Sequence, residues 1–240
     1  MKQISFPALM ALGLTAQVSF AATVFTENFT YADGSLVGAV GSPWQTTSGA
    51  TPGEVNVVAN AAVVSQAETE DVNAPITPAG TFFNSGTLTL TMSATFTTLP
   101  AVQNYFAHLK DSTTSGFRGR IFATTTGATA GSFRLGISNS TTTTAIVATD
   151  LSLDTPIAIT MAWNAAAGTA SLSVNGGTAV AAVDAASFLN ISSIGLRQST
   201  NIGIMTIDNI SVDATALAVP EPSTALLGLL AGLGLMRRRR

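Results

Sequence analysis

The stretch TLTLTMSATFT, residues 87–97, decides the fold. Apolar side chains occupy every second position from Leu88 to Phe96, and hydroxyl side chains occupy the positions between them. Successive side chains of a β-strand point to opposite faces, so this alternation predicts a strand with one buried face and one polar face. A strand of this kind must pack its apolar face against a second layer.

The same alternation recurs along the chain. Residues 157–163 repeat it, from Ile157 to Trp163, and Trp163 is therefore expected in the core. Leu172 and Val174 lead into Asn175-Gly176-Gly177, which predicts a hairpin because Asn and Gly tolerate positive φ. Further strands are expected at 55–64, 105–109, 117–123, 132–137 and 205–212. The predicted fold class is all-β, a two-sheet antiparallel β-sandwich.

The amino-terminal residues predict export. Lys2 precedes an apolar region at 4–18, and small residues follow at Ser19 and Ala21. This pattern is typical of a secretory signal peptide with a signal helix, here residues 1–21, cleaved after Ala21 or, alternatively, after Ala22. The chain has no cysteine, so an exported domain would be stabilised by its core without disulfides.

The carboxyl-terminal residues predict a short membrane helix. Val219-Pro220-Glu221-Pro222 is followed by the uncharged run STALLGLLAGLGLM and then by Arg237, Arg238, Arg239 and Arg240. A helix over the run would be roughly 21 Å long, against a bilayer core of ~30 Å. The arginines would stay on the cytoplasmic side and stop transfer, and the prolines would keep the Glu221 segment extended and accessible.

These terminal residues resemble the PEP-CTERM sorting signal of exopolysaccharide-producing Gram-negative bacteria. The resemblance covers the motif Val219-Pro220-Glu221-Pro222, the apolar helix and the arginine cluster. It implies export through Sec, an inner-membrane-anchored precursor, and processing near the motif by an exosortase, which would be the partner. The mature protein would then reside at the cell surface or in the extracellular biofilm matrix. An ordinary C-terminal membrane anchor is the alternative.

The exported body is acidic. Removing Lys2 and the four terminal arginines leaves 5 basic residues, and removing Glu221 leaves 12 acidic ones, a net charge of about −7. This balance argues against nucleic acid as a partner and favours cations over polyanions. The expected organisation is a signal peptide at 1–21, one β-sandwich domain at 22–216 and the sorting segment at 217–240.

Several segments of the body resemble LamG-like, concanavalin A-like jelly-roll domains. The first are Asn28 to Leu36 followed by Trp44, and Glu70-Asp71-Val72-Asn73 before a proline-containing turn. The others follow in order at 105–111, 117–122, 149–154 and 206–212. The resemblance implies two stacked antiparallel sheets of about six or seven strands each. This fold hosts lectins, glycosidases, adhesins and inert spacers, so it does not settle function.

Catalytic residues are sparse, and the protein is expected not to be an enzyme. No cysteine nucleophile exists, and a Ser-His-Asp site would have to use His108, which the strand pattern makes structural. The Cα atoms of Glu68 and Glu70 would lie ~6.6 Å apart on one face of a strand. Glycosidases place their two carboxyl groups at comparable separations. No Trp or Tyr lies near them in sequence, so an exposed acidic turn is the simpler interpretation.

The aromatic residues offer candidates for ligand contact. Trp44, which follows a Gly-Ser-Pro loop, is the best candidate for an exposed ligand contact, and Tyr105 is a second. Calcium would need several oxygen ligands, which Asp150, Asp154, Asp208 and Asn209 supply without a dense ligand motif. No cofactor and no metal are therefore expected, with calcium as the open alternative.

The sequence thus predicts an exported, exosortase-sorted protein of the cell surface or matrix with a structural or adhesive role. The alternative is a lectin-like module that binds exopolysaccharide. A glycoside hydrolase or lyase is a more distant alternative.

Overall fold

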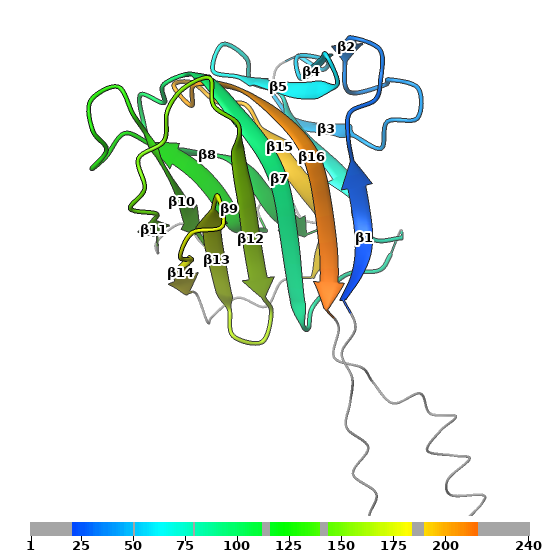
Figure 1. Cartoon of the computed structure of the whole chain (residues 1–240). Helices are drawn as coiled ribbons and strands as arrows, with labels where there is room; N and C mark the ends of the chain where they lie inside the picture. The colour runs from blue at the N-terminus through cyan, green and yellow to red at the C-terminus, as the bar shows by residue number, and fades with distance from the viewer. Residues whose placement is uncertain are drawn as a thin grey trace, which may run out of the picture. The chain divides into compact units, whose positions relative to one another are not determined.

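The computed structural model describes residues 21–49, 51–78, 80–111, 116–139, 144–183 and 190–215. Within these ranges the chain forms sixteen β-strands arranged in two antiparallel sheets, as the alternation predicts (Figure 1). The described part contains no helix long and apolar enough to cross a membrane. The expected signal helix and the C-terminal helix lie outside the described residues.

The larger sheet, sheet A, contains nine strands. β16 lies near its middle and pairs with β7, with β5 and, along its second half, with β1. In spatial order the strands are β14 (Val180–Val183), β13 (Thr169–Val174), β12 (Ile157–Asn164), β7 (Thr87–Thr98), β16 (Ile204–Thr215), β5 (Ala61–Ser65), β4 (Asn56–Val58) and β2 (Gly34–Ser35), with β1 (Ala21–Glu27) beside β16.

The second sheet, sheet B, contains seven strands. In order they are β11 (Thr144–Ile146), β10 (Arg134–Ser138), β9 (Phe117–Thr124), β8 (Asn104–Asp111), β15 (Ile191–Arg197), β6 (Asp71–Pro75) and β3 (Gln45–Ser48). The expectation of six or seven strands holds for sheet B. It is too low for sheet A, because short strands near the amino terminus extend that sheet.

The strand β7 has the predicted alternation. Leu88, Leu90, Met92, Ala94 and Phe96 are buried, and the residues between them are partly exposed. On one side it pairs with β12 over eight residues in unbroken register. On the other side it pairs with β16, whose register shifts at a bulge around Asp208. β7 thus joins the two halves of sheet A.

Two turns show how glycine and asparagine set the local structure. The segment predicted as one strand at 55–64 is two strands, β4 and β5, because Ala59 and Asn60 adopt φ values of 51° and 61° and turn the chain back. The predicted turn after Val174 is confirmed: Asn175 and Gly176 have φ of 51° and 71°, and the Gly177 N–H donates to the Val174 carbonyl.

The core lies between the sheets and is rich in aromatic contacts. Phe96 of β7 packs edge-on against Phe106 of β8, with ring centroids 5.6 Å apart, and against Phe133 at 4.5 Å. Trp163 is buried, as predicted, and pairs across the ladder with Leu88. Because these rings come from both sheets, each sheet covers the apolar face of the other.

A second buried cluster surrounds the carboxylate of Glu27, at the end of β1. Glu27 accepts hydrogen bonds from the Phe29 N–H at 2.7 Å, the Tyr31 hydroxyl at 2.7 Å and the Trp44 indole N–H at 2.9 Å. The Trp44 ring stacks on Phe29 with centroids 6.0 Å apart. Burial and the neighbouring Glu27 raise the pKa of Tyr31. One carboxylate therefore satisfies three donors of the loop after β1.

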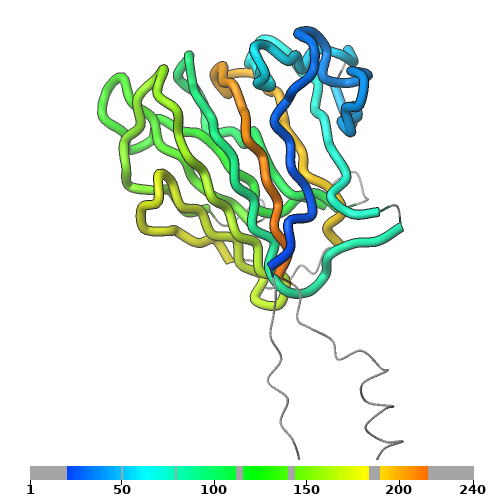
Figure 2. The backbone as a smooth tube through the Cα atoms, turned by 45° about the vertical axis from the view of Figure 1, so that its right-hand side comes forward, coloured from blue at the N-terminus to red at the C-terminus, as the bar shows by residue number. Residues whose placement is uncertain are grey.

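The two ends of the described chain lie side by side. β1 runs antiparallel to β16, and Ala21 is opposite Thr215 (Figure 2). The expected cleavage residues Ala21 and Ala22 are thus the exposed first residues of β1.

Replacing Glu27 with alanine is expected to destabilise the fold strongly. Three donors, from Phe29, Tyr31 and Trp44, would lose their acceptor inside the protein, and each unsatisfied buried group costs about 1–3 kcal/mol. We expect the free energy of unfolding to fall by roughly 3 kcal/mol or more, measured by urea denaturation of the full chain in mild detergent. Asp213→Ala, which removes an exposed acceptor of Thr23, should change stability by at most about 0.5 kcal/mol. Equal effects of the two changes would contradict the role of Glu27.

Candidate functional site

The outer face of sheet B brings together polar, aromatic and basic side chains from five strands. One row across the sheet runs Gln45, Asn73, Gly195 and His108, since these residues are register partners. The next row runs Pro75, Ser193, Lys110 and Phe117. The inner face of the same strands carries core residues such as Val72, Ile194 and Leu109. Alternation therefore separates a core face from a face that meets solvent.

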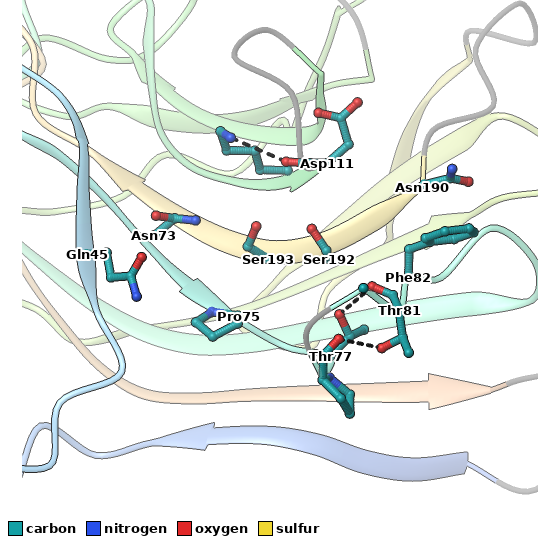
Figure 3. Close-up of a pocket in the computed structure, with 13 residues that line it drawn as sticks. Gln45, Asn73, Pro75, Thr77, Thr81, Phe82, Asp111, Asn190, Ser192 and Ser193 are labelled. Atoms are coloured by element: carbon teal, nitrogen blue, oxygen red, sulfur yellow. Dashed lines mark hydrogen bonds between the residues drawn. The ribbon is translucent and has the colours of Figure 1, made fainter.

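A pocket of about 590 Å³ lies on this outer face. Figure 3 shows polar side chains from β3, β6 and β15 around it, together with the segment that carries Thr77, Thr81 and Phe82. A bulge between Ile191 and Ser193 lets both Ser192 and Ser193 line the pocket. The lining is Gln45, Asn73, Pro75, Thr77, Pro78, Gly80, Thr81, Phe82, Lys110, Asp111, Asn190, Ser192 and Ser193.

The loop that borders the pocket is held by its own threonines. The Thr77 hydroxyl donates to the Thr81 carbonyl at 2.8 Å, and the Thr81 hydroxyl donates to the Pro78 carbonyl at 2.6 Å (Figure 3). These bonds support a turn from which Phe82 presents a ring that is 47% exposed. An exposed ring beside amides and hydroxyls combines an apolar contact with groups that both donate and accept hydrogen bonds.

Gly195 allows His108 to lie flat on the face. A Cβ at Gly195 would come within 2.5 Å of His108 Nε2, so the ring occupies the space that a side chain would need. His108 is 3% exposed and is covered by the rings of Tyr105 and Phe117, with centroids at 5.4 and 4.7 Å. Burial, helped by the charges of Arg120, Lys110 and Arg197, lowers its pKa to about 3. His108 is therefore neutral at physiological pH.

The guanidinium groups of two arginines, Arg197 and Arg120, lie over the ring of Tyr105. The Arg197 guanidinium carbon lies 4.3 Å from the ring centroid, and that of Arg120 lies 5.0 Å from it. Arg120 also lies 5.2 Å from the centroid of Phe117. Arg197 donates to Asn104 at 2.5 Å and lies 3.8 Å from a carboxylate oxygen of Asp71. Cation–π contacts orient both guanidinium groups, and the polar partners fix that of Arg197 further.

A smaller pocket of about 160 Å³ opens beside Arg120. A Cβ at Gly136 would clash with the Phe122 ring at 2.3 Å, so this glycine makes room for a pocket wall. The lining is Gln103, Asn104, Tyr105, Arg120, Phe122, Ser138 and Thr144. Both pockets therefore lie on sheet B, with His108 and Tyr105 on the strand they share, β8.

The expectation that Trp44 is an exposed ligand contact is wrong. Trp44 is 2% exposed, its indole N–H donates to Glu27, and its ring stacks on Phe29. The preceding loop folds over the end of the core and buries the ring. Tyr105, in contrast, lines the pocket beside Arg120, and its contact with a ligand stays a prediction.

Glu70, in the acidic segment at 68–71, is buried, so the interpretation of an exposed turn does not hold for this residue. Glu70 is fully buried and accepts hydrogen bonds from the Thr46 hydroxyl at 2.5 Å and the Val55 N–H at 2.8 Å. Asp71 accepts from Ser48, and burial raises its pKa. Both oxygens of Glu70 therefore accept hydrogen bonds inside the protein.

Two of the residues considered for calcium, Asp150 and Asp208, have protein partners for their carboxylate oxygens. Asp150 accepts from the backbone and hydroxyl of Thr129 and pairs with Arg134 at 2.6 Å, and these bonds lower its pKa to about 2. Both oxygens of Asp208 accept hydrogen bonds from Asn209. No group of three or more His, Asp or Glu residues that could hold a metal occurs in the described ranges. Calcium binding by these residues and by Asp154 stays untested.

The sorting residues cannot be placed. Val219 to Pro222 and Arg237 to Arg240 lie outside the described residues, so the motif stays a prediction. Ala21 and Ala22 are described, in β1, and they pair with Thr215 and Ala214.

Sequence reasoning missed most of the outer face of sheet B. It singled out Tyr105 and His108 but not Arg120, Arg197, Asn73 or Ser193. One signal was available: the body has few basic residues, and all of them fall in segments predicted as strands or close to Tyr105, apart from Arg197. The pairing of β15 with β8, which brings Arg197 to Tyr105, depends on residues far apart in the chain.

Comparison with solved structures supports the fold. The chain is similar to the CBM2 module of the evolved Dit of Lactobacillus casei BL23 phage J-1, with a TM-score of 0.55, 9% identity, and coverage of 84% of this chain and 99% of that one. It is also similar to a sialidase, with a TM-score of 0.52, 13% identity, and coverage of 79% and 19%. At these identities the similarities show a β-sandwich of the jelly-roll type and no more.

A third similarity, to an alginate lyase from Alteromonas sp. 272, has a TM-score of 0.49 at 10% identity and covers 73% of this chain and 96% of that one. No protein-family model matches the chain, and no curated protein sequence matches it.

Burial of His108 predicts that stability falls with acid. The folded chain binds a proton at His108 only near pH 3, whereas the unfolded chain does so near the ordinary pKa of 6.5. The contribution of neutral His108 to the free energy of unfolding is therefore complete above pH 6.5. It decreases as the pH falls, by at most about 1.4 kcal/mol per pH unit. In urea denaturation between pH 7 and pH 4.5, His108→Gln should show a shallower pH slope than the unmodified chain. Identical slopes would contradict the assignment.

Proposed function

We propose that residues 21–215 form a non-catalytic carbohydrate-binding module whose ligand occupies the outer face of sheet B. The observation that carries this proposal is the pocket of about 590 Å³ between Asn73, Ser193 and the exposed ring of Phe82. The geometry favours the carbohydrate-binding alternative over a purely structural role. Glycan binding would also supply the adhesive role expected from the sequence.

The chemistry of the lining matches a hydroxyl-rich ligand. Amides such as Gln45, Asn73 and Asn190 and hydroxyls such as Ser192 and Ser193 both donate and accept hydrogen bonds, as sugar hydroxyls do. The Phe82 ring offers an apolar surface for the C–H face of a sugar ring. A few convergent polar groups in a concave site are the usual arrangement for a small ligand. One of the fold neighbours, a CBM2 module, agrees with this proposal.

Two observations favour binding without catalysis. His108 lies beneath the rings of Tyr105 and Phe117, so it is badly placed to exchange a proton with a substrate. Glu70 uses both of its oxygens within the protein. None of the three residues considered for acid–base chemistry, His108, Glu68 and Glu70, lines the pocket.

The cellular setting is proposed from the sequence. The LamG-like resemblance agrees with a jelly-roll binding module, and the terminal motif agrees with export through Sec and processing by an exosortase. The pairing of β1 with β16 supports this proposal, because cleavage near Ala21 and beyond residue 216 would leave the described strands intact apart from one exposed residue. The module would then act at the cell surface or in the matrix.

Glycan binding is tested by titrating the full chain, in mild detergent, with a panel of neutral and acidic polysaccharides in a calorimeter. We expect at least one member to bind. Asn73→Ala should weaken that binding about tenfold, since loss of one well-placed hydrogen-bonding group costs about 1.4 kcal/mol.

Asn56→Ala is the matched control, because Asn56 lies on β4 of sheet A and its amide donates only to the nearby Glu54 carbonyl among the bonds described. It should bind as the unmodified chain does. Absence of binding to every member, or equal loss in the two variants, would overturn the proposal.

Processing is tested by the intact mass of the protein released from cells. We expect a mature chain that lacks residues 1–21 and the segment from the proline motif through Arg240. Deletion of the exosortase should leave the precursor in the inner membrane. A surface protein that keeps Arg237–Arg240 would contradict processing while leaving glycan binding untouched.

A further inference from the structure

The basic residues of the domain are gathered on one sheet. Between residues 21 and 215 the chain has five, and every one lies on four neighbouring strands of sheet B, β8, β9, β10 and β15. The strands of sheet A have none. These five residues are Lys110, Arg118, Arg120, Arg134 and Arg197. A domain that is acidic overall therefore carries its positive charge on the sheet that has the candidate site.

Three of these cations meet around His108. The positive charges of Arg120, Lys110 and Arg197 all help to lower the pKa of His108, and the charge of Arg197 helps to lower the pKa of Arg120. Arg197 is partly neutralised by Asp71 at 3.8 Å, and Asp111 is a second carboxylate in the lining of the larger pocket. Mutual repulsion of like charges is strongest where side chains are shielded from water, so an anion bound here would relieve it.

Among the described residues, Arg120 has aromatic neighbours and no ion-pair partner. Its guanidinium lies about equally far from the rings of Tyr105 and Phe117, at 5.0 and 5.2 Å, and it forms no ion pair with any carboxylate in the described ranges. Its Nε is buried and has no hydrogen-bond partner among the described residues. Burial and the charge of Arg197 lower the pKa of Arg120. The residue also lines the smaller pocket, where a ligand can reach it.

Arg134 provides the contrast on the same sheet. It is paired with Asp150 at 2.6 Å, and so its charge is already compensated. Two arginines on adjacent strands, Arg120 on β9 and Arg134 on β10, thus differ in whether the protein supplies the anion. A fixed, planar guanidinium without a carboxylate partner is suited to receive one from a ligand, through paired hydrogen bonds.

Tyr105 also packs against the basic residues of the site. Its ring is in contact with Arg197, Arg120, His108 and Phe117, so it is a support that orients the two guanidinium groups. The exposed apolar ring of the site is Phe82, in the larger pocket.

Building on the carbohydrate-binding function proposed above, we infer that the ligand is an acidic polysaccharide, whose anionic groups bind at Arg120 beside Arg197 while neighbouring sugar hydroxyls occupy the larger pocket. The net charge of the domain led to the expectation that it favours cations over polyanions. An acidic ligand reverses that expectation for this site alone. The rest of the surface is acidic, so a polyanion would be directed to this sheet and repelled elsewhere.

The test compares polysaccharides that differ in charge alone. The full chain in mild detergent is titrated with polygalacturonate and with its methyl ester, and separately with dextran sulfate and with dextran, at 50 mM and 200 mM salt. We expect the charged member of at least one pair to bind at least tenfold more tightly than its neutral mate at low salt, and its affinity to fall at high salt. The two pairs separate carboxylate from sulfate recognition.

Three variants test the role of Arg120. Arg120→Gln should reduce binding of the charged polymer at least tenfold, and Arg134→Gln, the matched loss of one positive charge, should change it less than twofold. Lys110→Gln should also weaken binding, which keeps the inference testable if Arg120→Gln fails to fold by circular dichroism. Equal affinity for charged and neutral mates, with binding still sensitive to Asn73→Ala, would overturn this inference and leave the proposed function standing. Absence of binding to all four polymers and to the neutral panel would overturn both.

Discussion

The pairing of β16 with β7 is the constraint on which the rest of the structure depends. β16, the last described strand, lies near the middle of sheet A and also pairs with β5 and β1. Its apolar residues, among them Met205, Ile207 and Val212, close the core beside those of β7. Sheet A is therefore completed only when residues separated by most of the chain meet, and the ends of the domain are brought together at the same step.

Sheet B is arranged to keep a functional face while its other face completes the core. Register shifts in the β8–β9 and β8–β15 ladders let neighbouring residues such as Ser192 and Ser193 face the same pocket. Gly195 and Gly136 leave space that the rings of His108 and Phe122 fill. Bulges and glycines are common where a sheet must redirect side chains near a site. Each of these local departures from regular pairing lies in the sheet that carries both pockets.

The buried carboxylates and the basic residues of sheet B have different surroundings. Buried carboxylates, Glu27 and Glu70, are satisfied by backbone, hydroxyl and indole donors and stabilise loops at the edges of the sandwich. The basic residues between 21 and 215 instead lie on sheet B, where aromatic rings contact Arg120 and Arg197, and Asp71 lies 3.8 Å from Arg197. Glu27 and Glu70 therefore stabilise the fold, whereas Lys110 and Arg120 line the two pockets and Arg197 contacts Tyr105 beside the smaller one. The net charge of the domain sums the acidic and basic residues and does not reveal this difference.

Alternation in β7, β12 and β13 determined the all-β class, the two layers and the burial of Trp163 from sequence alone, because strand periodicity is a local property. The Asn175-Gly176 turn was determined in the same way, by the φ values those residues tolerate. The burial of Trp44 and Glu70 was not, since each depends on a loop folding onto a distant donor or acceptor. Only the tertiary structure decided the site: Tyr105, Arg120 and Arg197 meet because β15 crosses back beside β8, and strand pairing over such separations leaves no periodic trace in the sequence.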